Sequence, residues 1–301
     1  MMVRSTADVT DAPAVPLAVR LAMASIDPSY LEGLVRKWAV PRHNLREAEA
    51  NRRVAGEVQR ELIANGYDVT IHGASRNLLA ARRERRPGPG RLVGAHYDSV
   101  PGCPGADDNA SALAALVACA KATSQFVPDA AVRYAVFNCE EDGLVGSREL
   151  VKCLGDAGEV GVTEAHVLEM VGYCCHDPGS QRVPSELPIA IPDTGDFLGL
   201  VANQRSIPAL RGVLACARAA VPELPVFGLE VAAGWEAALP VLSRSDHASF
   251  WQAAIPGVMW TDTAEYRNPH YHQRTDTPDT LDYEFLARVT RLAVAVAAIA
   301  R

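Results

Sequence analysis

Histidine and carboxylate residues are concentrated in the stretch GAHYDSVPGCPGADDNASALAAL, which covers residues 94–116. It contains His96, Asp98, Asp107 and Asp108, and it lies between an apolar run typical of a buried strand and a run typical of a helix. Imidazole and carboxylate ligands without a thiolate suit zinc, or another divalent first-row ion, in a catalytic site. The stretch therefore indicates metal-dependent chemistry.

More residues of the same types follow further along the chain, close to the ends of other apolar runs. They are Glu140, Glu141, Glu169, His270, His272 and Asp276. Carboxylates that converge on one edge of a fold repel one another and raise their own pKa values unless cations neutralise them. Two metal ions bridged by one carboxylate meet that requirement. Of the adjacent glutamates, one can bind metal while its neighbour acts as general base towards a water molecule that the metal activates.

Each of these residues also has a structural interpretation when it is taken alone. A single histidine at a strand end is usually structural, an aspartate before a helix is usually an N-cap, and paired glutamates usually form a solvated turn. Their recurrence at matching strand ends favours the ligand interpretation. The remaining histidines keep the structural interpretation because no carboxylate cluster is expected beside them; these are His43, His72, His166 and His176.

The elements that must position these residues alternate along the chain. Strands are expected at RNLLAARR, RLVGAH, AVRYAVFNC, EAHVLEMVGY, PVFGLEV and PGVMWT. Helices are expected at residues 44–64 and 110–122 and at LVGSRELVKCL, DFLGLVANQ, PALRGVLACARAAV and LDYEFLARVTRLAVAVAAIAR. This order predicts a single α/β domain with a mixed, mostly parallel central sheet and helices on both faces. Such sheets bind ligands beyond the carboxyl ends of their strands, where the candidate residues fall.

No linker that would divide the chain is visible in the sequence. We assign residues 1–27 to an N-terminal extension and residues 28–301 to the catalytic domain. The segment from Asp177 to Gly195 contains several proline and glycine residues and predicts a long loop over the edge of the sheet, with a lid as the alternative.

Composition limits the possible partners. The net charge of −7 makes nucleic-acid binding an improbable main activity, and the short basic run ARRERR at 81–86 is expected to be a solvated loop. The N-terminal residues lack the continuous apolar core of a signal peptide. No stretch reaches membrane-spanning length without a charge, so no membrane partner is expected. The sequence does not predict the oligomeric state.

Cysteine usage indicates a reducing compartment. The seven cysteines are odd in number and show no CxxC spacing, which argues against a disulfide framework and against a thiolate zinc site. We therefore expect a cytoplasmic protein. The adjacent pair Cys174 and Cys175 is expected to be small, partly buried side chains, with a redox-active pair as the alternative.

Several short motifs together carry a resemblance to a known family. In chain order they are GAHYDS, GADDNASA, NCEEDGLVGS, VLEMVGY, SDHASF and NPHYHQRTDT. They resemble the co-catalytic zinc aminopeptidase family, which includes bacterial leucyl aminopeptidases, glutamate carboxypeptidase II and glutaminyl cyclase. The resemblance extends from Glu47 to the C-terminus, and so many ordered motifs are far more specific than one short pattern.

The resemblance implies a zinc-exopeptidase fold and a dinuclear zinc site. His96 is expected to bind one zinc ion, together with Glu169, and Asp108 to bridge both ions. Glu141 and His272 are expected to bind the second ion. The chain departs from the family pattern at one of these ligands. Glu169 stands where many members have an aspartate.

The resemblance also assigns roles beside the metal ions. Asp98 is expected to orient His96 through its other ring nitrogen, and Glu140 to act as general acid and base. Tyr271 is expected to be either an oxyanion donor or a structural tyrosine, with equal weight. In SDHASF, Asp246 and His247 are expected to support the site without binding metal. The peptide that follows Asp108 is expected to be cis. A further departure is Ala112, which ends GADDNASA at a position where glycine is frequent in the family, and it is expected to affect helix packing only.

These residues predict a zinc-dependent exopeptidase, most directly an aminopeptidase that removes the N-terminal residue of a peptide. An apolar pocket built from parts of residues 173–250 is expected to receive the first side chain. The alternatives are glutaminyl cyclase-like acyl transfer with a single zinc and hydrolysis of a small non-peptide amide. A non-catalytic binding module is disfavoured because Glu140 and the ligands are all present. A calcium-stabilised loop is disfavoured because calcium prefers oxygen to imidazole.

Overall fold

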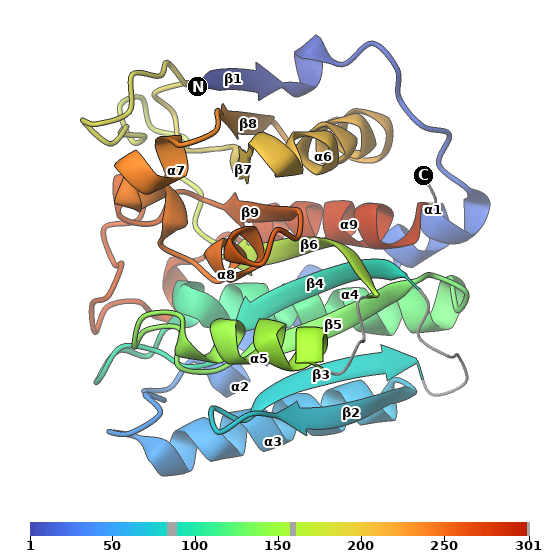
Figure 1. Ribbon diagram of the computed structural model, residues 1–301, viewed down its shortest axis with the longest axis vertical. Helices are drawn as coiled ribbons and strands as arrows, with labels where there is room; N and C mark the ends of the chain where they lie inside the picture. Colours follow the sequence, from blue (N-terminus) through green and yellow to red (C-terminus); the bar gives the residue numbers. More distant parts are fainter. Residues whose placement is uncertain (83–88, 157–160, 300–301) are drawn as a thin grey trace.

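A nine-stranded sheet forms the centre of the protein (Figure 1). The structure is a computed structural model that describes residues 1–82, 89–156 and 161–299. The strands lie in the order β1-β8-β7-β9-β6-β4-β5-β3-β2. Their bounds are β1 Met2–Ser5, β2 Tyr67–His72, β3 Asn77–Arg82, β4 Gly90–His96, β5 Val132–Phe137, β6 Val162–Glu169, β7 Leu198–Asn203, β8 Val226–Val231 and β9 Gly257–Thr261.

Parallel pairing dominates the middle of the sheet, and antiparallel pairing dominates its edges. Strand β4 pairs in parallel with β5 and with β6, β6 pairs in parallel with β9, and β7 pairs in parallel with β8. The pairs β1–β8, β2–β3, β3–β5 and β7–β9 are antiparallel. The carboxyl ends of β4, β5 and β6 therefore meet at one edge, where the sequence concentrates its histidine and carboxylate residues.

Helices cover both faces of the sheet, as the sequence predicts. Helices α5 and α8 lie in front of the sheet in Figure 1, and α4 and α9 lie behind it. The helix bounds are α1 Leu17–Ala24, α2 Pro28–Trp38, α3 Ala48–Ala64, α4 Ala112–Phe126, α5 Val145–Asp156, α6 Ile207–Ala220, α7 Trp235–Ala238, α8 His247–Gln252 and α9 Tyr283–Ala298. Short 3₁₀ turns occupy Thr6–Asp8, Gln204–Ser206, Pro240–Ser243, Ala264–Tyr266 and Pro278–Thr280.

Side-chain alternation along β5 shows why this strand is apolar from Tyr134 to Phe137. Tyr134 and Val136 face the larger core beneath α4 and α9, whereas Ala135 and Phe137 face the smaller core beneath α5 and α8. A central strand that is buried on both faces needs apolar residues at successive positions. Phe137 also packs edge-on against Phe250 of α8, with ring centroids 6.2 Å apart.

The prediction of a helix at DFLGLVANQ is wrong. Leu198–Asn203 forms strand β7, which pairs with β8 on one side and β9 on the other. The following helix, α6, begins only at Ile207. A six-residue apolar run is compatible with either a buried helix or a buried strand. Here the run is a strand because its backbone hydrogen-bonds to a neighbouring strand on each side. Strands β1 and β2 were also not identified from the sequence.

Residues 1–27, which the sequence assigns to an extension, contact the rest of the fold. Strand β1 pairs with β8 in the register Met2↔Glu230 to Ser5↔Phe227. Helix α1 buries Val19, Ala22 and Met23, and it packs against α9 and α4. Residues 83–86 of the basic run lie outside the described residues. Over the described residues, no helix is both long and apolar enough to cross a membrane.

A buried arginine supports the connection between β4 and α4. The side chain of Arg42 is inaccessible to solvent. Its guanidinium donates hydrogen bonds to the carbonyl oxygens of Tyr97, Pro104 and Gly105 at 2.7, 2.5 and 2.9 Å. Gly105 has a φ of 61°, and an added Cβ would lie only 2.2 Å from the carbonyl oxygen of Asp108. Arg42 and Gly105 thus fix the path of the chain on its way to Asp108.

We predict that Arg42→Met lowers the free energy of unfolding by about 3–5 kcal/mol, because it leaves several buried carbonyl oxygens without donors. Chemical denaturation monitored by circular dichroism measures the change. Arg36→Met is the matched control, since Arg36 forms exposed ion pairs with Glu32 and Asp279. A loss for Arg42→Met no greater than that of the control would show that the guanidinium does not support this connection.

Candidate metal centre

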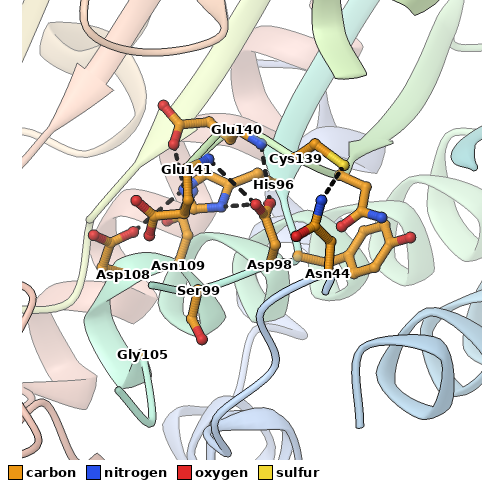
Figure 2. Close-up of polar contacts among 12 residues, drawn as sticks. Asn44, His96, Asp98, Ser99, Gly105, Asp108, Asn109, Cys139, Glu140 and Glu141 are labelled. Carbon is orange, nitrogen blue, oxygen red and sulfur yellow. Dashed lines mark hydrogen bonds and ion pairs between the residues drawn. The ribbon is translucent and has the colours of Figure 1, made fainter. Parts of the chain in front are cut away.

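The candidate ligands come together at one edge of the sheet. His96 ends β4, Glu169 ends β6, and Glu140 and Glu141 follow shortly after β5. Figure 2 shows the Asp108, Glu140 and Glu141 side chains gathered on one side of His96, with Asp98 on the other side of the ring. Segments that are distant in sequence thus place the acidic and imidazole groups side by side.

Two groups of potential ligands form, and one aspartate joins them. The first group contains His96, whose Nε2 lies 3.3 Å from Asp108 Oδ1 and 3.3 Å from Glu169 Oε1. The second contains His272, whose Nε2 lies 3.1 Å from Asp108 Oδ2 and 3.3 Å from Glu141 Oε2. The two oxygens of Asp108 therefore face different histidines. This is the arrangement that a bridging carboxylate requires.

The spacing of these atoms fits zinc. Zinc–nitrogen and zinc–oxygen bonds of about 2.0–2.2 Å at a tetrahedral angle place neighbouring ligand atoms about 3.4 Å apart. The separations around Asp108 range from 3.1 to 3.3 Å. In addition, Asp108 Oδ1 and Glu141 Oε1 are buried and make no hydrogen bond. Buried oxygen atoms that lack hydrogen-bond donors are available to a cation, so the residues present fit zinc.

The local excess of negative charge raises the pKa values of both histidines. Burial by itself lowers the pKa of His96, but the charges of Glu169 and Glu140 outweigh it and raise the pKa well above the ordinary value. For His272 burial also opposes protonation, yet hydrogen bonds to Asp108 and Glu141 raise the pKa to about 10. The site therefore attracts positive charge, which metal ions would supply in place of protons.

The pKa values of the adjacent glutamates are also raised, but here burial is the main cause. Burial raises the pKa of Glu140 well above its ordinary value, although the nearby His96 opposes the shift. Burial and the charge of Asp108 raise the pKa of Glu141 to about 7. Glu140 Oε2 lies 4.0 Å from His96 Nε2, further away than the oxygens of Asp108 and Glu169. Glu140 thus lies within reach of an ion held by His96 and Glu169, but further from the ring than the other carboxylates.

Asp98 holds both glutamates and the first histidine in place. Its Oδ1 accepts a hydrogen bond from the Glu140 amide and its Oδ2 accepts one from the Glu141 amide, each at 3.2 Å. Its Oδ1 also lies 3.4 Å from His96 Nδ1, on the ring side opposite the proposed metal. The carboxylate is fully buried. One side chain therefore orients residues that follow two different strands.

The turn that begins α4 is tied to the end of β6 by Asn109. The Asp108–Asn109 peptide bond is cis, as the family resemblance implies. Asn109 Nδ2 donates to the carbonyl oxygen of Leu168 at 3.0 Å, and Asn109 Oδ1 accepts from the Met170 amide at 2.9 Å. These bonds fix both neighbours of Glu169. The position of this ligand is thereby coupled to that of Asp108.

Some candidates contribute to the site without joining either ligand group. Asp276 accepts hydrogen bonds from the amides of Asp107 and Asp108 at 2.8 and 3.1 Å. His270 contacts Thr275 at 3.0 Å through its Nδ1. His272 itself has a φ of 57°, a left-handed conformation that residues other than glycine seldom adopt. Of these residues, only His272 belongs to a ligand group.

Glu169 is held by a serine that sequence reasoning missed. Ser245 Oγ donates to Glu169 Oε2 at 2.6 Å, which leaves Glu169 Oε1 facing His96. This contact positions a side chain that is one methylene longer than the aspartate of many relatives. The neighbouring Asp246 is fully buried, and its carboxylate oxygens make no hydrogen bond. His247 Nε2 lies 2.9 Å from the carbonyl oxygen of Leu242 and supports the preceding turn.

Tyr271 lies against the second histidine. Its ring stacks on His272, with centroids 3.7 Å apart and an interplanar angle of 24°. Its hydroxyl oxygen accepts a hydrogen bond from Arg244 Nη2 at 2.9 Å. Since a guanidinium cannot accept, the hydroxyl proton of Tyr271 remains available for another acceptor. Arg244 was not identified from the sequence, although it directly precedes the SDHASF motif.

A cavity of about 510 Å³ opens beside the ligands. Asp108, Glu140, Glu141, Glu169 and His272 line one part of it. Apolar residues line the rest, including Leu187, Ile189 and Ile191 of the 177–195 segment, Phe197, Phe227 and Val3 of β1. The segment expected to be a long loop thus forms one wall of the cavity, where the sequence predicts an apolar pocket.

Comparison with known proteins identifies the family. The profile described as peptidase family M28 matches residues 77–173 and 233–297. The uncharacterized protein YfbL of Escherichia coli (strain K12) is 36% identical over 232 residues, which cover 74% of this chain and 70% of that protein. The chain belongs to peptidase family M28. The family resemblance drawn from its motifs is therefore confirmed.

Solved structures agree with the M28 assignment. The LapA aminopeptidase of Legionella pneumophila superimposes with a TM-score of 0.76 at 17% identity, covering 98% of this chain and 79% of that one, and shows the shared fold. BSAP, a zinc aminopeptidase from Bacillus subtilis, is 25% identical with a TM-score of 0.51, covering 73% of this chain and 48% of that one. The α/β fold and the assignment to a hydrolase of peptide bonds are thus supported independently of the site geometry.

We predict that Asp276→Asn weakens zinc binding by about 10–100-fold, because an amide group replaces one acceptor oxygen and the backbone at Asp108 loses its support. Competition between the protein and a chelator of known affinity measures the effect. Asp279→Asn is the matched control, since the Asp279 side chain is 75% exposed and pairs only with Arg36 among the described ion pairs. Equal zinc affinity in the two variants would contradict this role for Asp276.

Proposed function

We propose that this M28 peptidase is an aminopeptidase that uses two zinc ions to remove the N-terminal residue of a peptide. The observation that carries the proposal is the Asp108 carboxylate, whose oxygens lie 3.3 Å from His96 Nε2 and 3.1 Å from His272 Nε2. His96 and Glu169 would hold one ion, and Glu141 and His272 the other. When bound, the ions would polarise the scissile carbonyl group and increase the acidity of a water molecule.

Glu140 is the proton carrier in this proposal. Its backbone amide is held by Asp98, and its carboxylate lies beside the first ligand group. Burial raises its pKa, which brings the carboxyl group closer to the working range of a general base near neutral pH. Glu140 would take a proton from water as the oxygen attacks the carbonyl carbon, and would then deliver it to the amine nitrogen as the C–N bond breaks.

Tyr271 would stabilise the negative charge that develops on the carbonyl oxygen. Arg244 occupies one lone pair of the phenol and leaves its proton free to point towards the substrate. The free amine of the substrate would be held near the carboxylate ligands. Its first side chain would enter the cavity, whose wall from Leu187 to Ile191 is apolar, so we expect a preference for apolar N-terminal residues.

We predict that Glu140→Gln lowers kcat by about 10²–10⁴-fold while zinc content stays unchanged, because the amide cannot accept the proton from water. Release of amine from aminoacyl anilides, together with elemental analysis, measures both quantities. Glu284→Gln serves as the control, since Glu284 is exposed on the first turn of α9. Hydrolysis at the wild-type rate by Glu140→Gln would rule out the proposed role.

We also predict that a chelator abolishes amine release and that zinc restores it. Full recovery should require occupancy of both histidine groups, so His96→Ala and His272→Ala should each remain inactive after zinc is returned. The reconstituted protein should also unfold at a higher temperature than the zinc-depleted protein, because ions bound only by the folded state stabilise it. Activity of His96→Ala with formation of pyroglutamate would instead favour single-zinc acyl transfer.

A further inference from the structure

A third group of potential metal ligands lies outside the catalytic groups. Ligand atoms of Cys174, His176 and Asp282 all lie within 4.8 Å of one another. Of the ligand groups found in the described residues, this one alone contains a cysteine. From the sequence, no carboxylate cluster is expected around His176, and that expectation is wrong. Both Asp282 and Asp196 lie near its ring.

The spacing of the sulfur and nitrogen atoms fits a shared tetrahedral ion. Cys174 Sγ lies 3.7 Å from His176 Nε2. A zinc ion with a sulfur ligand at about 2.3 Å and a nitrogen ligand at about 2.0 Å holds these atoms about 3.5 Å apart. The observed separation therefore needs only a small adjustment to accept the ion. A magnesium or calcium ion fits this donor set poorly, because both ions prefer oxygen.

The orientation of His176 supports this interpretation. Its Nδ1 lies 3.5 Å from Asp196 Oδ2, on the side of the ring away from Cys174. A histidine that binds metal through one nitrogen usually donates its other N–H to a carboxylate or carbonyl group, which fixes the tautomer. Asp196 therefore directs the Nε2 lone pair towards the thiol. This is notable because the His176 side chain is 67% exposed and has few other constraints.

Asp282 supplies the third ligand from a different part of the chain. It is the N-cap of α9, where Oδ1 accepts a hydrogen bond from the Phe285 amide at 2.8 Å. Its own amide donates to the carbonyl oxygen of Gly172 at 2.9 Å, which draws the start of α9 against the segment that carries Cys174. The backbone of Asp282 is thus placed beside this segment by contacts that do not depend on a metal ion.

We propose that Cys174, His176 and Asp282 bind a third zinc ion that takes no part in the hydrolytic reaction. The Cys174 thiol would lose its proton to solvent as the zinc–sulfur bond forms, and water would fill the remaining coordination position. The proposal does not depend on the proposed peptidase function, because none of its ligands belongs to the catalytic groups.

The ionisation behaviour of the thiol is compatible with such a site. Burial and the nearby Asp282 raise the pKa of Cys174 to about 12, although Arg267 and Arg288 oppose the shift. A divalent cation between the thiol and Asp282 would remove this repulsion and favour the thiolate. Metal binding would therefore be coupled to release of a proton.

The ion would connect the base of the cavity wall to α9. The segment that begins after Cys175 returns at Gly195, where the Cys175 amide donates to the Gly195 carbonyl oxygen at 2.9 Å. Between these residues the chain supplies Leu187, Ile189 and Ile191 to the cavity. A metal ion bound by Cys174, His176 and Asp282 would hold the start of this segment against the N-terminus of α9.

Metal content and cobalt spectroscopy test the site on the full-length chain. Wild-type protein should contain close to three zinc ions, and Cys174→Ser close to two. Exchange of zinc for Co²⁺ should give a near-ultraviolet thiolate-to-cobalt band in the wild type, because the catalytic groups contain no thiolate. Cys174→Ser should lack this band. His176→Ala should bind the third cobalt ion at least about tenfold more weakly than the wild type.

Two variants separate this proposal from its alternatives. Cys175→Ser should keep the cobalt band, since Cys175 Sγ points to Asp177 at 3.9 Å and is not a member of the ligand group. His272→Ala should also keep the band even though it loses a catalytic ligand. Absence of the band from the wild type, or a Cys174–Cys175 disulfide in the zinc-loaded protein, would overturn the proposal.

Hydrogen exchange tests the structural consequence. The amides of residues 177–195 should exchange more slowly in wild-type protein with three ions bound than in Cys174→Ser with two. The melting temperatures of the metal-free proteins should agree, which would show that the serine variant folds normally. Equal exchange in the two loaded proteins would contradict a role for the ion in fastening this segment.

Discussion

The carboxyl edge of the sheet must hold a dense group of acidic side chains around two histidines, and the rest of the site depends on this constraint. The carboxylates are Asp98, Asp108, Glu140, Glu141 and Glu169. Burial raises the pKa of Glu140 and Glu141, while the same negative charges raise that of His96 and His272. Two divalent ions would neutralise the group with fewer ligands than separate sites require, because Asp108 serves both.

Neutralisation by metal works only if the ligands cannot move apart, and buried polar side chains provide that restraint. Asp98 bonds the backbone on which both glutamates lie, and Asn109 bonds both neighbours of Glu169. Arg42 holds the preceding loop through its carbonyl oxygens, and Asp276 holds the amide of Asp108 itself. These side chains act on backbone groups, so the ligand geometry is fixed before any ion binds.

The sequence predicts the parts of this arrangement that depend on residue type and local order. His96, Glu140, Glu141 and Glu169 lie where strand ends were expected, and the parallel strands bring them together. The strand at Leu198–Asn203 could not be distinguished from a helix, because its partners on both sides lie elsewhere in the chain. For the same reason Arg42 and Ser245 were missed: their roles consist of contacts with distant residues, which leave no local pattern.

The connection between β6 and β7 links the proposed catalytic site, the cluster at Cys174 and the wall of the cavity. It begins with Glu169, a proposed zinc ligand, passes the cluster at Cys174 and His176, and then forms the apolar wall of the cavity. The wall is therefore joined to the ligand by one short stretch of chain. Asn109 fixes the ligand end of this stretch, and the contact of Asp282 with Gly172 fixes the next part. A metal ion at Cys174 would restrain the wall as well. The residues proposed to select the substrate and the proposed ligand Glu169 would then be held by the same segment of chain.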